Sequence, residues 1–258
     1  MTSTDNNWQN PALASVPVNW VVQRVAETGS TNTDLYGGAQ HGAEHRTALM
    51  ADNQTAGRGR LDRTWEARSG ANLLVSLLFR KSHSDISLCQ RIVAVSAVRA
   101  CQKFLTEPTA NSASIKLKWP NDLLLNERKF GGMLSVVDAE QTFIVVGIGI
   151  NVSWAPDYAA KLKDLATICS FEPVDLLYVL LGQIDIVEKY SVQQLHDEYV
   201  DSLSTLNKVV RVELTNGQIV TGRAIALEPS GRLVIDDGNE KHLIETGDVV
   251  HLRDANYE

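Results

Sequence analysis

The sequence has few cysteines and no long apolar run. Its 258 residues include only three cysteines, Cys89, Cys101 and Cys169, an odd number without the spacing of metal ligands. No run approaches the roughly 18 apolar residues that a membrane helix requires. The polar N-terminus lacks the charged and apolar regions of a signal peptide. We therefore predict a cytoplasmic protein with no membrane partner.

The chain also lacks the residue groupings on which most hydrolases depend. No Ser, Cys or Thr stands beside an evident His base, and no carboxylate pair stands out. No group of His, Asp and Glu has metal-ligand spacing, so the sequence leaves any direct metal ligand unknown. The net charge of −7 argues against non-specific binding to a polyanion.

One basic loop, residues 54–65, stands out against this acidic background. It lies between two apolar runs, 48–51 and 72–79, which predict buried strands. Its glycines allow close approach to a ligand, its arginines suit phosphate or carboxylate, and its tryptophan offers a flat face for a base. The residues concerned are Gly57, Arg58, Gly59, Arg60, Arg63 and Trp65. The loop indicates a small anionic ligand; a solvated basic hairpin loop is the alternative.

Hydrophobic periodicity predicts alternating strands and helices up to residue 203. Gly29 ends the first strand, and Ser30 or Thr31 is placed to cap the helix that follows. The predicted elements are strand 20–26, helix 30–41, strands 48–51 and 72–79, helix 85–105, linker 107–114, strand 115–119 resumed at 123–125, polar turn 126–129, strands 130–137 and 143–151, helix 156–170 and a helical region 172–203.

The pattern changes after residue 206. Short strands follow one another with Gly, Asn and Asp turns between them, including the hairpin signal Asn216-Gly217. About 50 residues of this kind predict a small β-barrel. We therefore predict a flexible arm at 1–17, a main domain at 18–206 and a C-terminal β-module at 207–258.

Four polar segments lie at predicted strand ends or turns: 30–32, 54–65, 118–129 and 147–151. Hydroxyl and amide side chains at a helix N-terminus can bind a polar head group, although helix capping also explains them. The glycines of 147–151 indicate either a ligand lying close against the strand or a bulge. A site rich in Arg, Lys and Asn stabilises developing negative charge, as phosphoryl or nucleotidyl transfer requires.

These segments resemble the biotin protein ligases that lack an N-terminal DNA-binding domain. The matching stretches occur in the family's order and spacing and are residues 29–32, 54–60, 118–122, 128–132 and 147–151. The resemblance implies an α+β fold, in which a mixed β-sheet catalytic domain flanked by helices, as in class II synthetases, precedes an SH3-like β-barrel. Only about 19 residues precede the first strand, against about 60 for a helix-turn-helix module, so no DNA partner is expected.

The resemblance also implies an activity. Such enzymes convert biotin and MgATP to biotinyl-5′-adenylate and then transfer biotin to a lysine of a biotin carboxyl carrier domain in a biotin-dependent carboxylase. The implied ligands are therefore biotin, ATP and Mg²⁺. A monomer or a weak homodimer is expected.

The family's site residues carry over onto matching positions of this chain. The implied biotin-binding residues are Ser30, Thr31, Asn32, Gln54, Arg58, Gly59, Arg60, Lys129, Gly132 and Gly147. The implied nucleotide-binding residues are Arg60, Arg63, Trp65, Asn121 and Asn151. Catalytic roles are implied for Lys129, Arg58, Arg60 and Asp122, with Lys129 at the carboxyl oxygen and Asp122 near either the incoming lysine or the metal.

Two departures from the family pattern and two alternatives stand beside this interpretation. The family usually has Gly where this chain has Asp62, a carboxylate that can pair with Arg60 or Arg63 and weaken the anion site. It often has Glu where this chain has Val136, which we interpret as a packing residue. The alternatives are a lipoate or octanoate ligase or transferase, whose expected His is absent from the loop, and a non-catalytic biotin- or nucleotide-binding protein. Lys129 and the loop arginines count against the second alternative.

Overall fold

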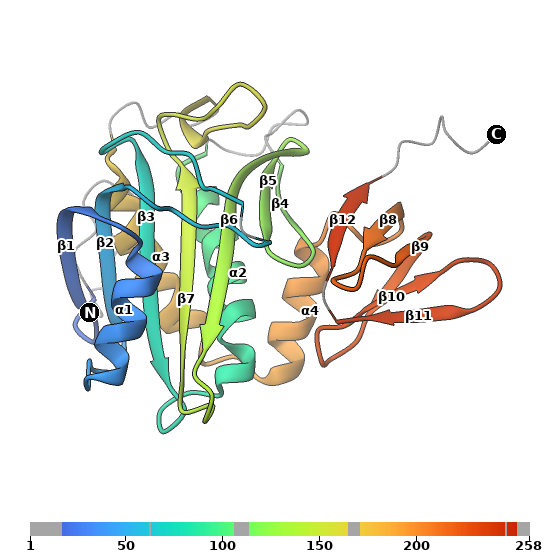
Figure 1. Ribbon diagram of the computed structural model, residues 1–258, viewed down its shortest axis with the longest axis horizontal. Coiled ribbons are helices and arrows are strands. Elements are labelled where there is room, and N and C mark those ends of the chain that lie inside the picture. Colours follow the sequence, from blue (N-terminus) through green and yellow to red (C-terminus); the bar gives the residue numbers. More distant parts are fainter. Residues whose placement is uncertain (1–16, 62, 106–113, 165–170, 246, 252–258) are drawn as a thin grey trace, which may run out of the picture.

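The computed structural model of the chain describes residues 17–61, 63–105, 114–164, 171–245 and 247–251. They form two β-sheets with helices packed on the larger one (Figure 1). Most of the predicted N-terminal arm, most of the predicted linker and the end of the predicted helix 156–170 lie outside the described residues.

The larger sheet has seven strands in the order β1-β2-β3-β7-β6-β5-β4. The first two strands are parallel, and every other neighbouring pair is antiparallel. Its strands are β1 (Val21–Thr28), β2 (Thr47–Gln54), β3 (Asn72–Arg80), β4 (Ile115–Lys118), β5 (Asp122–Leu125), β6 (Arg128–Val137) and β7 (Phe143–Asn151).

Helices cover both faces of this sheet. On one face α1 (Thr31–Gln40) packs on β3 and β7, and on the other α2 (Ile86–Gln102) and α3 (Pro173–Val187) form a second layer, with α4 (Val192–Ser202) beside α2 and β4 (Figure 1). Leu35 and Ala39 of α1 bury themselves against Leu49, Leu78 and Val145. The larger core lies between the sheet and α2, α3 and α4.

The alternation of side chains along the central strands decides what faces α1. Because Leu78 and Val145 pack beneath α1, residues 74 and 76 of β3 and residues 147 and 149 of β7 lie on the same face. The helix has only ten residues, so it covers only part of this face. We call this surface the α1 face.

The C-terminal module is a five-stranded antiparallel sheet in the order β11-β10-β9-β8-β12. Its strands are β8 (Val209–Glu213), β9 (Ile219–Leu227), β10 (Leu233–Asp236), β11 (Lys241–Ile244) and β12 (Asp248–His251). Asn216 and Gly217 form the predicted hairpin turn, where the glycine has a φ of 82°. The predicted α+β class with a small C-terminal β-module is confirmed.

The two sheets share one continuous core. Val210 and Val212 of β8 belong to the same buried cluster as Leu117 and Trp119 of the main sheet. The indole Nε1 of Trp119 donates to the carbonyl of Gly231 at 3.0 Å. The domain boundary near residue 206 stays a prediction, because the buried core continues across it from one sheet to the other. Within the described residues, no helix is both long and apolar enough to cross a membrane.

Three local predictions are wrong. Residues 115–125 form a hairpin rather than one resumed strand, because the chain reverses at Pro120 and Lys118 pairs with Asp122. Lys129 lies in β6 rather than in a turn, since Asn126 and Glu127 alone reverse the chain, with φ of 47° and 63°.

The third error concerns residues 156–161. They form irregular structure ahead of a 3₁₀ turn (Leu162–Asp164) because the segment packs on strand ends instead of coiling. The backbone N–H of Ala160 donates to the carbonyl of Lys129 at 2.8 Å. The region 172–203 divides into α3 and α4, because Ser191 begins a new helix with a capping box that includes Gln194.

We predict that Trp119→Ala lowers the free energy of unfolding by about 3–5 kcal/mol, the range for deleting a buried aromatic ring. The ring is only 3% exposed and joins the two sheets. Urea denaturation measures the loss, with the exposed Val192→Ala as the control. A change below about 1 kcal/mol would show that the sheets do not depend on this contact.

Candidate active site

A cavity opens on the α1 face beside the N-terminus of α1. The empty space between its lining residues amounts to about 780 Å³, and part of this space is open solvent. Every residue predicted for the site lines it except Asn151. The predicted lining residues are Ser30, Thr31, Asn32, Gln54, Arg58, Gly59, Arg60, Arg63, Trp65, Asn121, Asp122, Lys129, Gly132 and Gly147.

One end of the cavity is a polar cup built on the start of α1. Ser30 is the N-cap residue of α1 and has an extended backbone. Its side chain makes no capping hydrogen bond, so this hydroxyl does not form the predicted cap. Thr31 donates its backbone N–H to Gln54 Oε1 at 2.8 Å and its hydroxyl to the same oxygen at 3.0 Å. The hydroxyls of Thr31 and Ser76 lie 2.9 Å apart. These contacts fix the hydroxyl and amide groups of the cup relative to one another.

Asn32 and Gly147 complete the cup. Asn32 Nδ2 donates to the carbonyl of Leu134 at 2.9 Å, which carries the amide across the face of β7. A Cβ atom at position 147 would lie 2.6 Å from that nitrogen, closer than atoms can approach. A side chain at position 147 would therefore displace the Asn32 amide from this hydrogen bond, and the strand contains no bulge there.

The other end of the cavity is cationic. The loop predicted to bind an anion folds as a narrow turn in which the N–H of Trp65 donates to Gly57 and the N–H of Gly59 donates to Arg63. A Cβ atom at position 57 would lie 3.0 Å from the carbonyl oxygen of Trp65. The glycine therefore lets the two limbs of the loop approach each other, and Arg58, Arg60 and Arg63 reach the cavity from this turn.

Lys129 joins this cationic end through an ion pair with Asp122, with 2.6 Å between Nζ and Oδ1. Residues three apart in a regular strand lie on opposite faces, yet Lys129 lies beside Gly132. A register shift between β5 and β6 inserts Phe130 as an extra residue, which turns Lys129 toward the cavity. A Cβ atom at Gly132 would lie 3.4 Å from the Lys129 Nζ.

Arg60 is the most enclosed of the loop cations. Burial lowers the pKa of Arg60, and the nearby carboxylates of Asp248 and Asp122 oppose that shift. Its Nη1 donates to Asn121 Oδ1 at 3.3 Å and to the carbonyl of Gly247 at 3.2 Å. The guanidinium is therefore held between the two sheets, where it lines the cavity.

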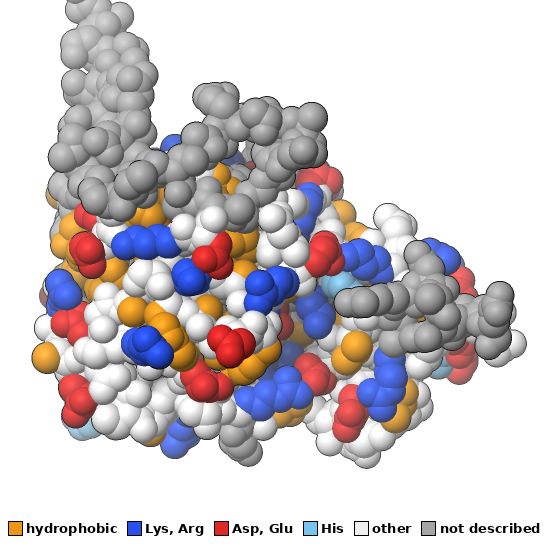
Figure 2. All heavy atoms as spheres, turned by 90° about the horizontal axis from the view of Figure 1, so that it is seen from above, with side chains coloured by type: hydrophobic (Ala, Val, Ile, Leu, Met, Phe, Trp, Pro, Cys, Tyr) orange, Lys and Arg blue, Asp and Glu red, His pale blue; other side chains and the backbone are white. Residues whose placement is uncertain are grey.

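One face of the molecule carries charges of both signs. On the face seen from above, basic and acidic side chains are interspersed over its coloured part (Figure 2). The positive charge is concentrated inside the cavity instead. A cluster of cations inside a cavity is the arrangement that a small anionic ligand would need.

Several lining residues were not predicted. Ser76 and Leu74 stand in an apolar run, and strict alternation from Leu78 was the signal that could have placed them on the same face. Asp248 comes from the C-terminal module, where no local signal marks it. Leu61, Ile148 and Gly149 lie in two of the segments singled out in the sequence but had no individual role predicted. The remaining lining residues are Val75, Met133 and Leu134.

Two predicted positions differ from the prediction, and a third lies outside the described residues. The side chain of Asn151 is buried away from the cavity, where its Nδ2 donates to the carbonyl of Ala160 at 3.1 Å. Val136 does not line the cavity and is 37% exposed, so the predicted packing role is wrong. Asp62 lies outside the described residues, and the carboxylate that pairs with Arg63 is that of Asp248.

Two family models match this chain. The biotin/lipoate A/B protein ligase family matches residues 6–153, and the biotin protein ligase C-terminal domain matches residues 205–252. The chain belongs to the biotin protein ligase family. The resemblance drawn from the motifs is confirmed, and so is the assignment to a family of enzymes.

Individual relatives agree with this family. A biotin–[acetyl-CoA-carboxylase] ligase of Mycobacterium tuberculosis is 35% identical, over 89% of this chain and 88% of that protein. The bifunctional ligase/repressor BirA of Bacillus subtilis is 29% identical over 85% of this chain and 70% of its own length. The biotin protein ligase of Aquifex aeolicus in complex with biotin and ATP shares the fold, with a TM-score of 0.74 and 24% identity over 90% of this chain and 99% of that one.

We predict that Gly147→Ala destabilises the fold by about 1–3 kcal/mol, the usual cost of forcing a methyl group into a filled site. The new Cβ would meet Asn32 Nδ2 at 2.6 Å. The control Gly37→Ala lies in α1 with no atom within 4 Å of its Cβ and should be neutral or stabilising. Thermal melting measures both variants. Equal melting temperatures for the two would show that the cup tolerates a side chain at position 147.

Proposed function

We propose that this chain is a biotin protein ligase that converts biotin and MgATP to biotinyl-5′-adenylate and transfers biotin to a lysine of a biotin carboxyl carrier domain. The observation that carries the proposal is that one cavity has two chemically different ends. Hydroxyl and amide groups of Thr31, Asn32 and Gln54 line one end, and the cations Arg58 and Lys129 line the other. Biotin has a ureido ring at one end and a carboxylate at the other. The family membership and the activities of the relatives support the same choice.

The floor of the cavity suits the apolar middle of such a substrate. Leu74, Leu134 and the glycines of β7 line the space between the cup and the cations. Gly147 and Gly149 have no side chains, so the Asn32 amide and the Trp65 indole lie close against β7 and border the space in which a flat bicyclic ring would lie. Hydroxyl and amide groups of the cup can both donate to and accept from a ureido group.

The first step joins the biotin carboxylate to the nucleotide. A carboxylate oxygen attacks the α-phosphorus of ATP, an O–P bond forms, and the P–O bond to pyrophosphate breaks. Negative charge grows on the phosphoryl oxygens, where Lys129, Arg58 and Arg60 can stabilise it. The ion pair with Asp122 holds the ammonium of Lys129 in the cavity before the substrates arrive.

Trp65 is the aromatic residue proposed for the adenine base. Its ring lies so close to Gly149 that a Cβ there would come within 2.6 Å of the indole. Lys129 Nζ lies 5.9 Å from the ring centroid, within range of a cation–π contact. Arg63 and Asn121 line the same end of the cavity and would contact the rest of the nucleotide. Asn151 has no comparable support, because its amide is bound to Ala160.

The carboxylates of the cavity fit a magnesium ion that arrives with ATP. Mg²⁺ usually keeps waters and is bound by one or two carboxylates together with substrate phosphates. Among the described residues, the lining carboxylates are Asp122 and Asp248. Asp122 could hold the ion, and the ion would neutralise phosphate charge. The group Asp237, Glu240 and His242 lies in the C-terminal module and does not line the cavity.

The second step transfers biotin to the carrier. The lysine nitrogen attacks the carbonyl carbon, a C–N bond forms, the C–O bond to AMP breaks, and the amine loses a proton. Asp122 lines the cavity, where it could either accept that proton or hold the metal.

The two alternatives have different sequence support. The family model over residues 6–153 covers both biotin and lipoate ligases, whereas the model over residues 205–252 describes biotin protein ligases. The C-terminal module therefore favours biotin over lipoate or octanoate. A non-catalytic binding protein would have no need of Lys129 and three loop arginines around one cavity.

Transfer of labelled biotin to a carboxyl-carrier domain, with and without ATP, tests the proposed function. We expect labelling only with ATP and Mg²⁺, together with pyrophosphate release. Parallel reactions with lipoate and octanoate test the acyl-transfer alternative. Binding of biotin without any transfer would identify a non-catalytic protein and overturn the proposal.

We predict that Lys129→Ala lowers the rate of adenylate formation by roughly 10²–10³-fold, about 2.7–4 kcal/mol, the loss expected for one transition-state donor. Lys129→Arg should not restore the rate, because a planar guanidinium cannot take the place of a compact ammonium. Pyrophosphate release measures both variants. The control Lys81→Ala changes an exposed lysine beyond the far end of β3.

Stability separates a catalytic from a structural role for this lysine. The Lys129 side chain is 44% exposed, so the free energy of unfolding of both variants should lie within about ±0.5 kcal/mol of that of the original chain. Normal turnover by Lys129→Ala would show that this lysine has no catalytic part.

A further inference from the structure

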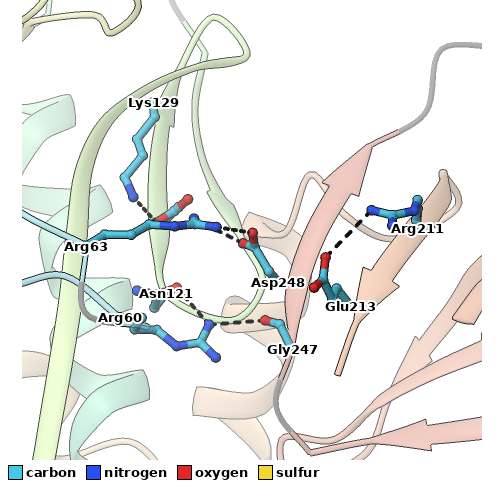
Figure 3. A network of polar contacts seen from close by, with 9 residues as sticks. Arg60, Arg63, Asn121, Lys129, Arg211, Glu213, Gly247 and Asp248 are labelled. Carbon is cyan, nitrogen blue, oxygen red and sulfur yellow. Dashed lines mark hydrogen bonds and ion pairs between the residues drawn. The ribbon is translucent and has the colours of Figure 1, made fainter. Parts of the chain in front are cut away.

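Two consecutive residues of the C-terminal module contact the basic loop across the cavity mouth (Figure 3). Arg63 Nη2 lies 2.5 Å from Asp248 Oδ2, and Arg63 Nη1 donates to Oδ1 at 3.4 Å. Beside them, Arg60 donates to the carbonyl of Gly247 at 3.2 Å. The start of β12 therefore holds two arginines that the proposed function assigns to the nucleotide.

Asp248 is fixed to the module by its own neighbours. It is the first residue of β12 and pairs with Glu213 of β8. A Cβ atom at Gly247 would lie 2.5 Å from Val212 Cγ1, so only glycine lets β12 start this close to β8. Asp248 also lines the cavity. The carboxylate thus extends from a closely packed part of the module backbone and lines the cavity.

The charges of this contact support one another. Burial would raise the pKa of Asp248, but the hydrogen bond and charge of Arg63, with the charges of Lys118 and Arg60, lower it overall. The hydrogen bond and charge of Asp248 raise the pKa of Arg63. Both groups are therefore ionised at neutral pH.

The pairing leaves Arg63 able to bind a second anion. A guanidinium has five N–H donors, and Asp248 takes one from each terminal nitrogen, which leaves three. The Arg63 side chain is 64% exposed, so without this partner it would lose rotamer freedom when it binds a phosphate. Holding it in advance lowers that entropic cost.

We propose that Asp248 is a positioning residue for ATP, which holds Arg63 at the cavity mouth so that its free N–H groups face the phosphates. This inference rests on the proposed function, because it takes the triphosphate as the ligand. It gives the C-terminal module a defined task in nucleotide binding, through one side chain. If Asp248 instead competed with phosphate for Arg63, removing its charge would lower the KM for ATP.

Steady-state pyrophosphate release by Asp248→Asn tests the proposal. We expect the KM for ATP to rise about fivefold, equivalent to about 1 kcal/mol, with kcat within about twofold and an unchanged Kd for biotin. Asp248→Glu should recover part of the ATP affinity. The matched control is Glu213→Gln, which removes a negative charge from the adjacent strand, where Glu213 pairs with Arg211 at 3.9 Å (Figure 3). Its KM for ATP should stay within about twofold.

A double-mutant cycle shows whether Asp248 acts through Arg63. If it does, Arg63→Gln/Asp248→Asn should have the same KM for ATP as Arg63→Gln alone. Additive effects, a KM that is unchanged in Asp248→Asn, or a KM that falls would each overturn the proposal. Failure of the original chain to release pyrophosphate from ATP and biotin would instead refute the proposed function, so the two failures are distinguishable.

Discussion

The alternation of side chains along β3 and β7 is the constraint on which the cavity depends. One set of positions is committed to the larger core, so the other set must face α1. Near the N-terminus of α1 that set includes Leu74 and three positions with small side chains or none, which are Ser76, Gly147 and Gly149. The same rule that fills the space beneath the middle of α1 with Leu78 and Val145 therefore leaves a hollow beside its N-terminus.

The contents of the hollow follow from electrostatics within a small volume. Three arginines and a lysine converge on it in a chain whose net charge is −7. Like charges at this density repel each other unless anions lie among them. Asp122 and Asp248 supply that charge through one ion pair each, to Lys129 and to Arg63. The resting site thus has internal counter-ions that keep its cations in place.

The C-terminal module is bound into this arrangement by packing as well as by charge. Trp119 belongs to a motif that the family resemblance places in the site, yet its ring is buried and its indole donates to Gly231 of the module. The following turn places Asn121 and Asp122 in the cavity. One short segment therefore fixes the module with its first residues and builds the site with its last.

The sequence by itself determined most of the elements, the α+β class and most of the residues that line the candidate cavity. Strand, helix and turn signals depend on neighbouring residues, so the runs 72–79 and 143–151 and the hairpin at Asn216-Gly217 could be predicted locally. The site motifs could also be identified, because each is contiguous in the chain. Only the tertiary structure decided the rest. The bulge at Phe130 turns Lys129 into the cavity, Asn151 turns toward Ala160, and Asp248 meets Arg63 from 185 positions away. No local pattern contains these facts, because each depends on which backbone lies opposite a side chain once both sheets have packed into one core.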